Sequence, residues 1–347
     1  MRQNNIFLML LKVFFFSSIL VATSAVRAEL KVVTTIKPLH SLIANVMDGV
    51  GEPALIIEGS TSPHSFTLKP SHAKLLEEAD IIFWVGESIE TFMERPLESI
   101  VKNAEVVEFM EVESINKLKF REESIFDDHD DHGHDDHDDH DDHDDHDDHD
   151  DHDDHDDHDD HDDHDDHDDH SGHDHHGHAH GEFDAHIWLD PMNVKEMVHE
   201  IAHELGDLDP ANKNKYEANA QATIQALDQL VNDIEKGINK DAKFVVFHDA
   251  YQYFEERFGV RAAGALTLNT DVLPGAKQIA DIQDVIKDRG IKCIFSEPQF
   301  NPKIITTIAE DMNIKTGVFD PLGANIDSNK DLYFKLIQNL GNELKGC

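Results

Sequence analysis

Three histidines lie at positions where metal ligands gather in α/β proteins. His64 follows a short predicted strand, His248 ends another, and His186 lies in the loop sequence Asp-Ala-His-Ile-Trp-Leu-Asp-Pro. Ligand groups in open α/β folds gather at the carboxyl ends of strands, so these three side chains can converge in one cleft. Three imidazoles suit Zn²⁺, a d¹⁰ ion with no geometric preference of its own. Taken singly, a histidine in a loop is more often an ordinary surface residue than a metal ligand.

The sequence also contains an HExxH motif, the zinc and general-base arrangement of metalloproteases, at His199-Glu200-Ile201-Ala202-His203. Apolar residues around the motif recur at helical spacing: Val194, Met197, Val198, Ile201, Leu205 and Leu208. Such a stripe is the buried face of an amphipathic helix, so both motif histidines fall on the solvated face. A zinc metalloprotease is therefore the weaker alternative, and we do not expect an enzyme.

A repeat of His-Asp-Asp with a period of three runs from residue 134 to residue 170. The surrounding segment, 127–182, offers no apolar core, so we predict a disordered insert in the first lobe. Histidine at every third position is typical of weak metal collection. Two alternatives stay open: a purely acidic spacer, and a zinc buffer or storage protein whose main site is the repeat.

The charge balance excludes some partners. The formal net charge is −44, and residues 127–180 hold 29 Asp with no Lys or Arg, which leaves −15 for the rest of the chain (−44 + 29). A chain with this balance repels phosphate backbones and anionic lipid surfaces, and it carries no basic stripe. We therefore expect no nucleic-acid partner.

The first residues indicate export. Arg2 and Lys12 precede an apolar run over 13–21 that leads to the small residues before Ala28. This layout predicts a signal peptide over 1–28 and a periplasmic protein. No Cys stands at the end of the run, where a lipid anchor would be attached to the mature N-terminus, so we expect a free rather than a lipid-anchored protein.

Two cysteines, Cys293 and Cys347, are present in the whole chain. In an oxidising compartment they are expected to pair as a disulfide, and the alternative is two separate thiols.

Short β-branched runs alternate with amphipathic helical patterns on both sides of the insert, which predicts parallel strands with helical crossovers. The predicted strands span 30–36, 54–57, 81–85, 105–107, 244–247, 292–295 and 315–319, and the clearest short helices span 39–47, 71–78 and 279–287.

We thus predict an α/β fold of two lobes, each a mainly parallel sheet with flanking helices, joined by one long rigid helix. The predicted boundaries are 29–211 for the N-terminal lobe, 212–240 for the linking helix and 241–347 for the C-terminal lobe. Because a rigid helix between the lobes would limit hinge closure, we expect the lobes to move little on metal binding.

The sequence resembles the zinc-specific, ZnuA-like binding proteins of ABC importers over essentially the whole mature chain. The matching motifs are Pro63-His64-Ser65-Phe66, Lys69-Pro70-Ser71, His186-Ile187-Trp188-Leu189-Asp190-Pro191, Val246-Phe247-His248-Asp249-Ala250-Tyr251, Glu297-Pro298-Gln299-Phe300 and Asp320-Pro321-Leu322-Gly323. An acidic, histidine-rich insert at this place is also typical of such proteins.

The resemblance implies that His64, His186 and His248 bind Zn²⁺ as the transported substrate. It implies a carboxylate or a water as the fourth ligand, and Asp320 is the matching carboxylate. Some members have Glu directly before the first histidine, where this chain has Pro63, which leaves Asp320 and water both open.

Related manganese importers carry a carboxylate at the position of His248, so the resemblance favours zinc, as does the preference of manganese for oxygen ligands. It further implies delivery to a membrane permease with its ATPase, and we expect a monomer. Because histidine ligands must be neutral to bind, zinc affinity is expected to fall as the pH drops through about 6.5.

Overall fold

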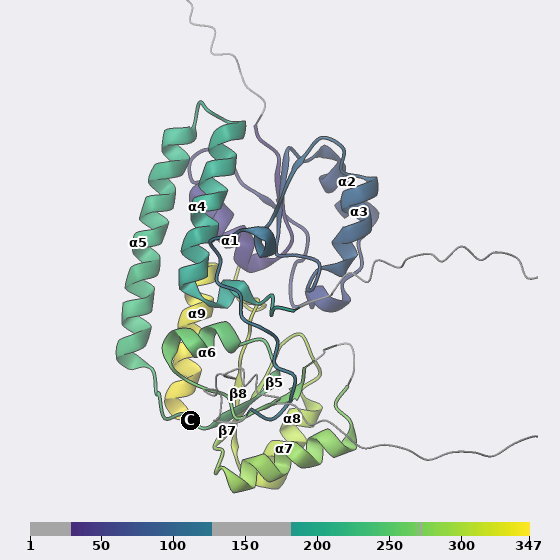
Figure 1. Ribbon diagram of the computed structural model, residues 1–347, viewed down its shortest axis with the longest axis vertical. Helices are drawn as coiled ribbons and strands as arrows, with labels where there is room; N and C mark the ends of the chain where they lie inside the picture. Colours follow the sequence, from purple (N-terminus) through teal and green to yellow (C-terminus); the bar gives the residue numbers. More distant parts are fainter. Residues whose placement is uncertain (1–28, 127–181, 269, 271–272) are drawn as a thin grey trace, which may run out of the picture.

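The computed structural model describes residues 29–126, 182–268, 270 and 273–347 (Figure 1). The predicted signal peptide, 1–28, and all but the last residue of the predicted insert, 127–182, lie outside the described residues. Within those described ranges, no helix is both long enough and apolar enough to cross a membrane.

The first sheet has four parallel strands in the order β2-β1-β3-β4. They are β1 (Val32–Thr34), β2 (Ala54–Leu55), β3 (Ile81–Trp84) and β4 (Glu105–Glu108). The inner strands β1 and β3 are buried along their whole length, as expected for parallel strands covered on both faces. All four predicted strands of this lobe are confirmed, and each end lies within two residues of its predicted position.

The second sheet is also parallel, in the order β6-β5-β7-β8. Its strands are β5 (Phe244–His248), β6 (Ala265–Thr267), β7 (Cys293–Ser296) and β8 (Lys315–Val318). Strand β6 is absent from the prediction, because three residues are too few to show a period. It follows Gly264, where a side chain would lie 2.6 Å from the carbonyl oxygen of Ser124. Glycine here permits the chain before the insert to approach the sheet closely.

Helices flank both sheets. In the first half these are α1 (Lys37–Val46), α2 (Pro70–Glu78), α3 (Glu94–Ser99) and α4 (Pro191–Leu208), and in the second half α6 (Gln252–Phe258), α7 (Ala276–Asp288), α8 (Lys303–Met312) and α9 (Leu332–Glu343). Short 3₁₀ turns complete the connections: η1 (Pro63–Ser65), η2 (Thr91–Met93), η3 (Phe109–Glu111), η4 (Ile187–Leu189) and η5 (Leu344–Gly346). The predicted two-lobed α/β fold is confirmed.

One long helix, α5 (Lys213–Gly237), occupies the position predicted for the linking helix. Its 25 residues give it a length of about 37 Å. It packs against α4, α1 and α9, and Figure 1 shows it running beside both halves of the molecule. Since α9 returns from the second sheet to pack on α1, the two halves also share one hydrophobic core. The exact lobe boundaries stay a prediction.

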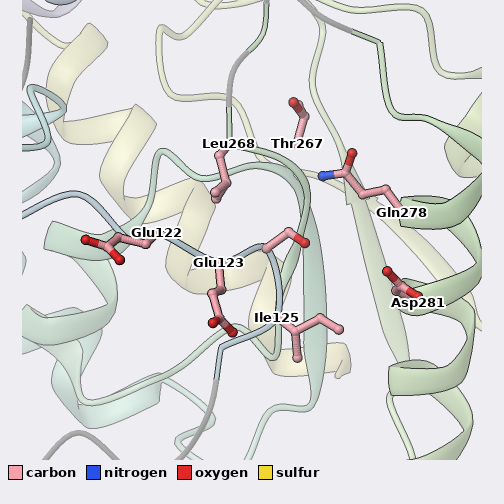
Figure 2. Close-up of a pocket in the computed structure, with 8 residues that line it drawn as sticks. Glu122, Glu123, Ile125, Thr267, Leu268, Gln278 and Asp281 are labelled. Atoms are coloured by element: carbon pink, nitrogen blue, oxygen red, sulfur yellow. The ribbon is translucent and has the colours of Figure 1, made fainter. Parts of the chain in front are cut away.

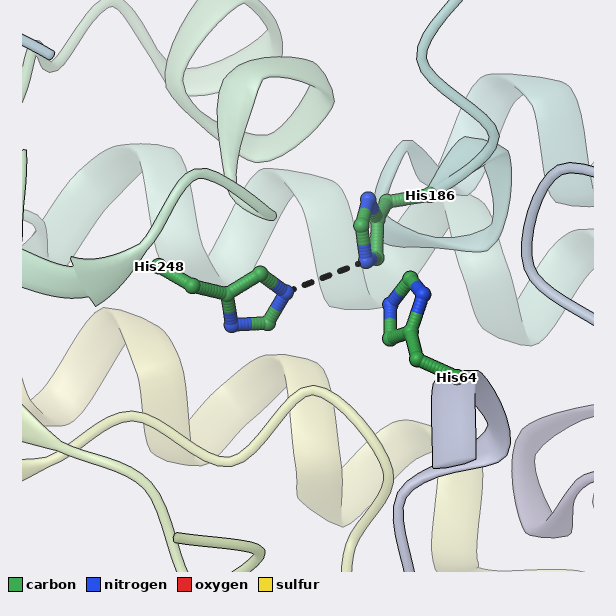
Figure 3. Close-up of side chains that lie close together, drawn as sticks. All are labelled: His64, His186 and His248. Carbon is green, nitrogen blue, oxygen red and sulfur yellow. Dashed lines mark hydrogen bonds between the residues drawn. The ribbon is translucent and has the colours of Figure 1, made fainter. Parts of the chain in front are cut away.

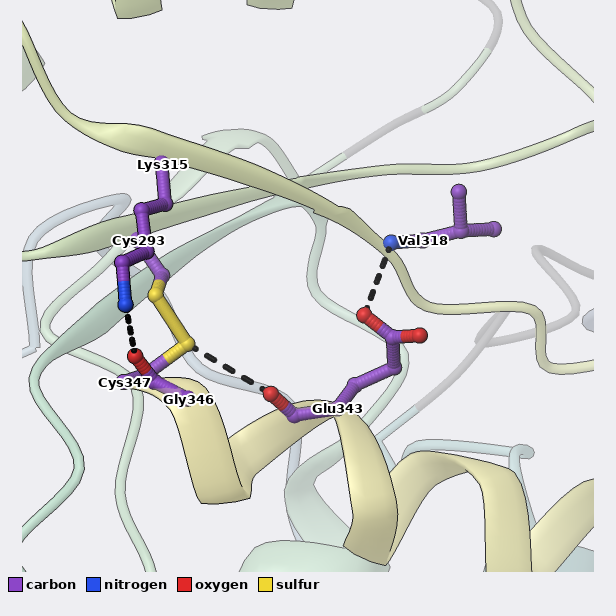
Figure 4. Close-up of a disulfide and its surroundings, with 6 residues drawn as sticks. All are labelled: Cys293, Lys315, Val318, Glu343, Gly346 and Cys347. Carbon is purple, nitrogen blue, oxygen red and sulfur yellow. Dashed lines mark hydrogen bonds between the residues drawn. A yellow bond between two sulfur atoms is a disulfide. The ribbon is translucent and has the colours of Figure 1, made fainter.

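The predicted disulfide is confirmed between Cys293, the first residue of β7, and Cys347, with 5.6 Å between their Cα atoms. Two side-chain contacts beside it can be followed in Figure 4. The Lys315 ammonium donates to the Gly346 carbonyl at 2.7 Å, and the Glu343 carboxylate accepts from the Val318 N–H at 3.4 Å. The C-terminal turn is thereby attached to β8, the outer strand of the second sheet, which would otherwise be an open edge.

Candidate metal centre

The three predicted histidines come together where the two halves of the chain meet (Figure 3). Their ring centroids lie 5.7 Å apart for His64 and His186, 5.9 Å for His64 and His248, and 5.2 Å for His186 and His248. The Nε2 atoms of His186 and His248 are 3.3 Å apart. One ring nitrogen from each residue lies within 4.8 Å of the other two, and no other such metal-competent group occurs among the described residues.

Short local structures position each ring. His64 is the middle residue of η1, which begins with Pro63, and His248 is the last residue of β5. His186 directly precedes η4, and helix α4 follows at once because the Asp190 carboxylate caps it by accepting from the Met192 N–H at 2.8 Å. All three candidate ligands are therefore positioned by short turns or by the end of a strand: η1 for His64, the turn before α4 for His186, and the end of β5 for His248.

Two carboxylates orient two of the rings. The Nδ1 of His186 lies 2.7 Å from Asp184, and the Nδ1 of His248 lies 2.7 Å from both oxygens of Glu297. Each carboxylate also accepts the backbone N–H of the histidine that it holds, at 3.0 Å for Asp184 and 3.2 Å for Glu297. With Nδ1 engaged as a donor, Nε2 of each ring is left to bind a metal.

Burial and neighbouring charge set the protonation of the site. Burial, and then repulsion from the other rings, place the pKa values of His64 and His186 well below the ordinary range. Burial lowers the pKa of His248 as well, but the charge and hydrogen bond of Glu297 outweigh it, so this pKa lies above its ordinary value. Burial raises the pKa of Asp184 to about 7. A proton therefore competes with a metal mainly at His248.

The cavity among the rings is small, about 10 Å³, which is the size needed for about one water molecule. Besides the histidines and Glu297, its walls are mostly apolar: Pro63, Trp188, Phe300, Pro321 and Leu322. Such a site admits an ion with few of its hydration waters, and its dry walls strengthen the electrostatic interactions inside.

Asp320, the candidate fourth ligand, does not belong to the group that the structure brings together. Its Oδ1 accepts from Gln299 Nε2 at 3.0 Å and from the N–H groups of Leu322 and Gly323 at 3.1 and 3.0 Å, while Oδ2 accepts from the Ala324 N–H at 2.6 Å. The carboxylate caps a turn whose next residue, Pro321, lines the cavity.

Asp184 and Glu297 were not predicted from the sequence to have a role. The available signals were an acidic residue two positions before a candidate ligand, and an acidic residue directly after β7, the neighbour of β5 in the sheet. Buried carboxylates at those places are typical partners of metal-binding histidines.

The HExxH motif lies on α4 as predicted, with its apolar stripe inward: Val194, Met197, Val198, Ile201 and Leu205 are fully buried and Leu208 is partly buried. His199 and His203 are both exposed. The Nδ1 of His203 lies 2.9 Å from the carboxylate of Glu204, its neighbour on the same face. Neither motif histidine belongs to the metal-competent group.

A larger cavity, about 510 Å³, lies on the second half of the molecule (Figure 2). Its walls come from the chain before the insert, the end of β6 and α7, and include the carboxylates Glu122, Glu123 and Asp281. No histidine lines it, so it does not offer the imidazole ligands of the three-histidine site.

The sequence profile of the ZnuA family, described as zinc-uptake complex component A, periplasmic, matches residues 32–347. The high-affinity zinc uptake system protein ZnuA of Brucella abortus (strain 2308) is 48% identical over 318 residues, which cover 91% of each chain. The protein of the same name from Haemophilus influenzae is 38% identical over 322 residues, which cover 92% of this chain and 93% of that one.

Among solved structures, the periplasmic zinc binding protein TroA from Treponema pallidum aligns with a TM-score of 0.68 at 17% identity, over 92% of this chain and 98% of that chain. At this identity the likeness concerns the fold, which both chains share. Because the family profile covers nearly the whole described chain and the Brucella relative covers 91% of it, the chain belongs to the ZnuA family of periplasmic zinc-uptake components.

Proposed function

We propose that His64, His186 and His248 bind one Zn²⁺ ion as transported substrate. The observation that supports this most directly is the convergence of one ring nitrogen from each residue within 4.8 Å, with Asp184 and Glu297 fixing two of the rings from behind. Three imidazoles with one open position suit tetrahedral Zn²⁺. Because the Asp320 carboxylate already accepts four hydrogen bonds, water is the fourth ligand in this proposal.

The chain serves, in this proposal, as the periplasmic zinc-binding component of an ABC importer and passes the ion to a membrane permease driven by an ATPase. Membership of the ZnuA family supports this. It acts as a binding protein and not as an enzyme, and the exposed His199 and His203 have no part in catalysis. Since one chain supplies all three histidines, a monomer is sufficient.

Calorimetric titration of zinc tests the ligand set. The reference is the mature protein lacking residues 127–180, which removes the repeat as a competing site. His64→Ala, His186→Ala and His248→Ala are each expected to abolish tight binding, because two imidazoles cannot complete the site. The matched control, His199→Ala with His203→Ala, is expected to bind zinc as the reference does.

Unchanged affinity in any of the three single variants would remove that residue from the ligand set. If the reference itself lost all tight binding, the principal site would lie in the repeat, as in the storage alternative. Zinc-dependent peptide cleavage that disappears in the double variant would favour the metalloprotease alternative.

A further inference from the structure

A buried lysine connects the two halves of the molecule beside the metal cavity. Lys37 is the first residue of α1 and is only 5% exposed. Its ammonium donates to three backbone carbonyls of the second half, Gly323 at 2.7 Å, Ala324 at 3.1 Å and Ile326 at 2.6 Å. These three bonds use the full donor capacity of an ammonium group.

The segment that Lys37 holds, residues 320–326, forms one wall of the metal cavity. Pro321 and Leu322 line the cavity, and the Trp188 indole N–H donates to the Pro321 carbonyl at 2.8 Å. The Asp320 carboxylate takes three N–H groups of the same segment. Asp320 thus accepts hydrogen bonds from the N–H groups of its own segment. Lys37, from the other half of the molecule, donates hydrogen bonds to the carbonyls of that segment.

The strength of this attachment follows from its surroundings. Hydrogen bonds from a charged donor in a buried setting are stronger than neutral ones, and a carbonyl left without its partner there is costly. Burial lowers the pKa of Lys37, while the charges of Asp320 and Asp327 oppose that effect. Loss of the ammonium would release three carbonyls at once and leave the cavity wall without this support from α1.

A rigid cavity wall affects which metal ion binds, because the size of the cavity limits how many ligands and waters an ion can keep. Zn²⁺ binds readily with four ligands, whereas ions that prefer octahedral oxygen coordination, such as Mn²⁺, need room for more ligands or waters. A cavity of about 10 Å³ has about the volume that one water molecule needs, so it does not accommodate an ion that keeps several waters.

We propose that Lys37 is a specificity-determining positioning residue, which pins segment 320–326 of the second half and so keeps the cavity too small for ions that retain several waters. The proposal rests on the proposed function of the three histidines. It assigns Lys37 no contact with the metal.

The test compares zinc and manganese dissociation constants in the full mature chain, for the wild type and for Lys37→Met. Binding in the cleft is followed by the fluorescence of Trp188, whose ring centroid lies 5.3 Å from that of His186, with a chelator present to buffer free metal. In Lys37→Met, the preference for zinc over manganese is expected to fall by about tenfold.

The matched control is Ser41→Ala. Ser41 also lies on α1 and contacts the second half of the molecule. Its hydroxyl donates to the Lys330 carbonyl at 2.9 Å and accepts from the Tyr333 N–H at 3.1 Å. Neither Lys330 nor Tyr333 lines the cavity. It is expected to lower the melting temperature and to leave the metal preference unchanged. Leu322→Ala, which enlarges the cavity directly, is expected to lower the preference for zinc over manganese, as Lys37→Met does. It replaces Lys37→Met in the test if that variant does not fold.

A zinc preference equal to wild type in folded Lys37→Met would overturn the proposal and leave Lys37 a purely structural residue. An equal loss of preference in Ser41→Ala would overturn it too, because loosening of the halves in general would then be the cause. An unchanged preference in Leu322→Ala would show that the wall does not select the ion. Absence of tight zinc binding in the wild type would overturn the proposed function and this proposal with it.

Discussion

Glu297→Gln removes the charge behind His248 while preserving the size of the side chain. In the structure both carboxylate oxygens lie 2.7 Å from the His248 Nδ1, and the residue is 3% exposed. The amide can still accept the Nδ1–H, so the substitution exchanges a charge-assisted hydrogen bond for a neutral one. That exchange costs about 1 kcal/mol, and partners of metal-binding histidines typically contribute about 10- to 100-fold to affinity. We expect zinc affinity near pH 8 to fall about tenfold.

The pH profile should shift as well. In the wild type, Glu297 holds the pKa of His248 above its ordinary value, so protons displace zinc as the pH falls through that raised pKa. Without the carboxylate, burial is no longer outweighed and the pKa of His248 falls. The decline in affinity should therefore begin at lower pH in Glu297→Gln than in the wild type, although affinity at high pH is weaker.

Zinc affinity measured by chelator competition from about pH 5 to about pH 8 covers this range. Glu90→Gln is the matched control, since the Glu90 carboxylate is also buried but accepts from the backbone N–H groups of Val85 and Gly86. Its affinity should equal that of the wild type. An unchanged onset of the pH decline in Glu297→Gln would contradict this prediction, because the charge of Glu297 would then not govern the protonation of His248.

Three further predictions concern the rest of the chain. Asp320→Asn should weaken zinc binding by less than about tenfold, because in the proposed ligand set the carboxylate only holds the turn. Loss of the tight site in calorimetry would instead make Asp320 a ligand. Cys293→Ser with Cys347→Ser should lower the free energy of unfolding by up to about 4 kcal/mol, measured in urea on the metal-free protein, and an unchanged value would show that the C-terminal turn is held without the disulfide. Deletion of residues 127–180 should remove several weak zinc sites and leave one tight one, and cells carrying it should show reduced uptake only when zinc is chelated. Equal uptake at every zinc level would favour the acidic spacer.

Much of the fold could be predicted because its signals are local. The apolar runs of β1, β3 and β5 and the three-and-four spacing of Leu227, Leu230 and Ile234 in α5 are consequences of burial at fixed periods. Strand β6 could not be predicted in this way. It is a three-residue strand, and its place depends on pairing with β5, more than fifteen residues earlier in the chain.

The candidate zinc ligands could be named without a structure, because His64, His186 and His248 stand at strand ends or loops that parallel topology must bring to one edge. How these side chains are held became clear from the folded chain alone. Asp184 and Glu297 set the usable nitrogen of two rings, and Lys37 reaches a segment 286 residues away along the chain. Such contacts depend on side-chain directions across two lobes, and no local period in a sequence records those directions.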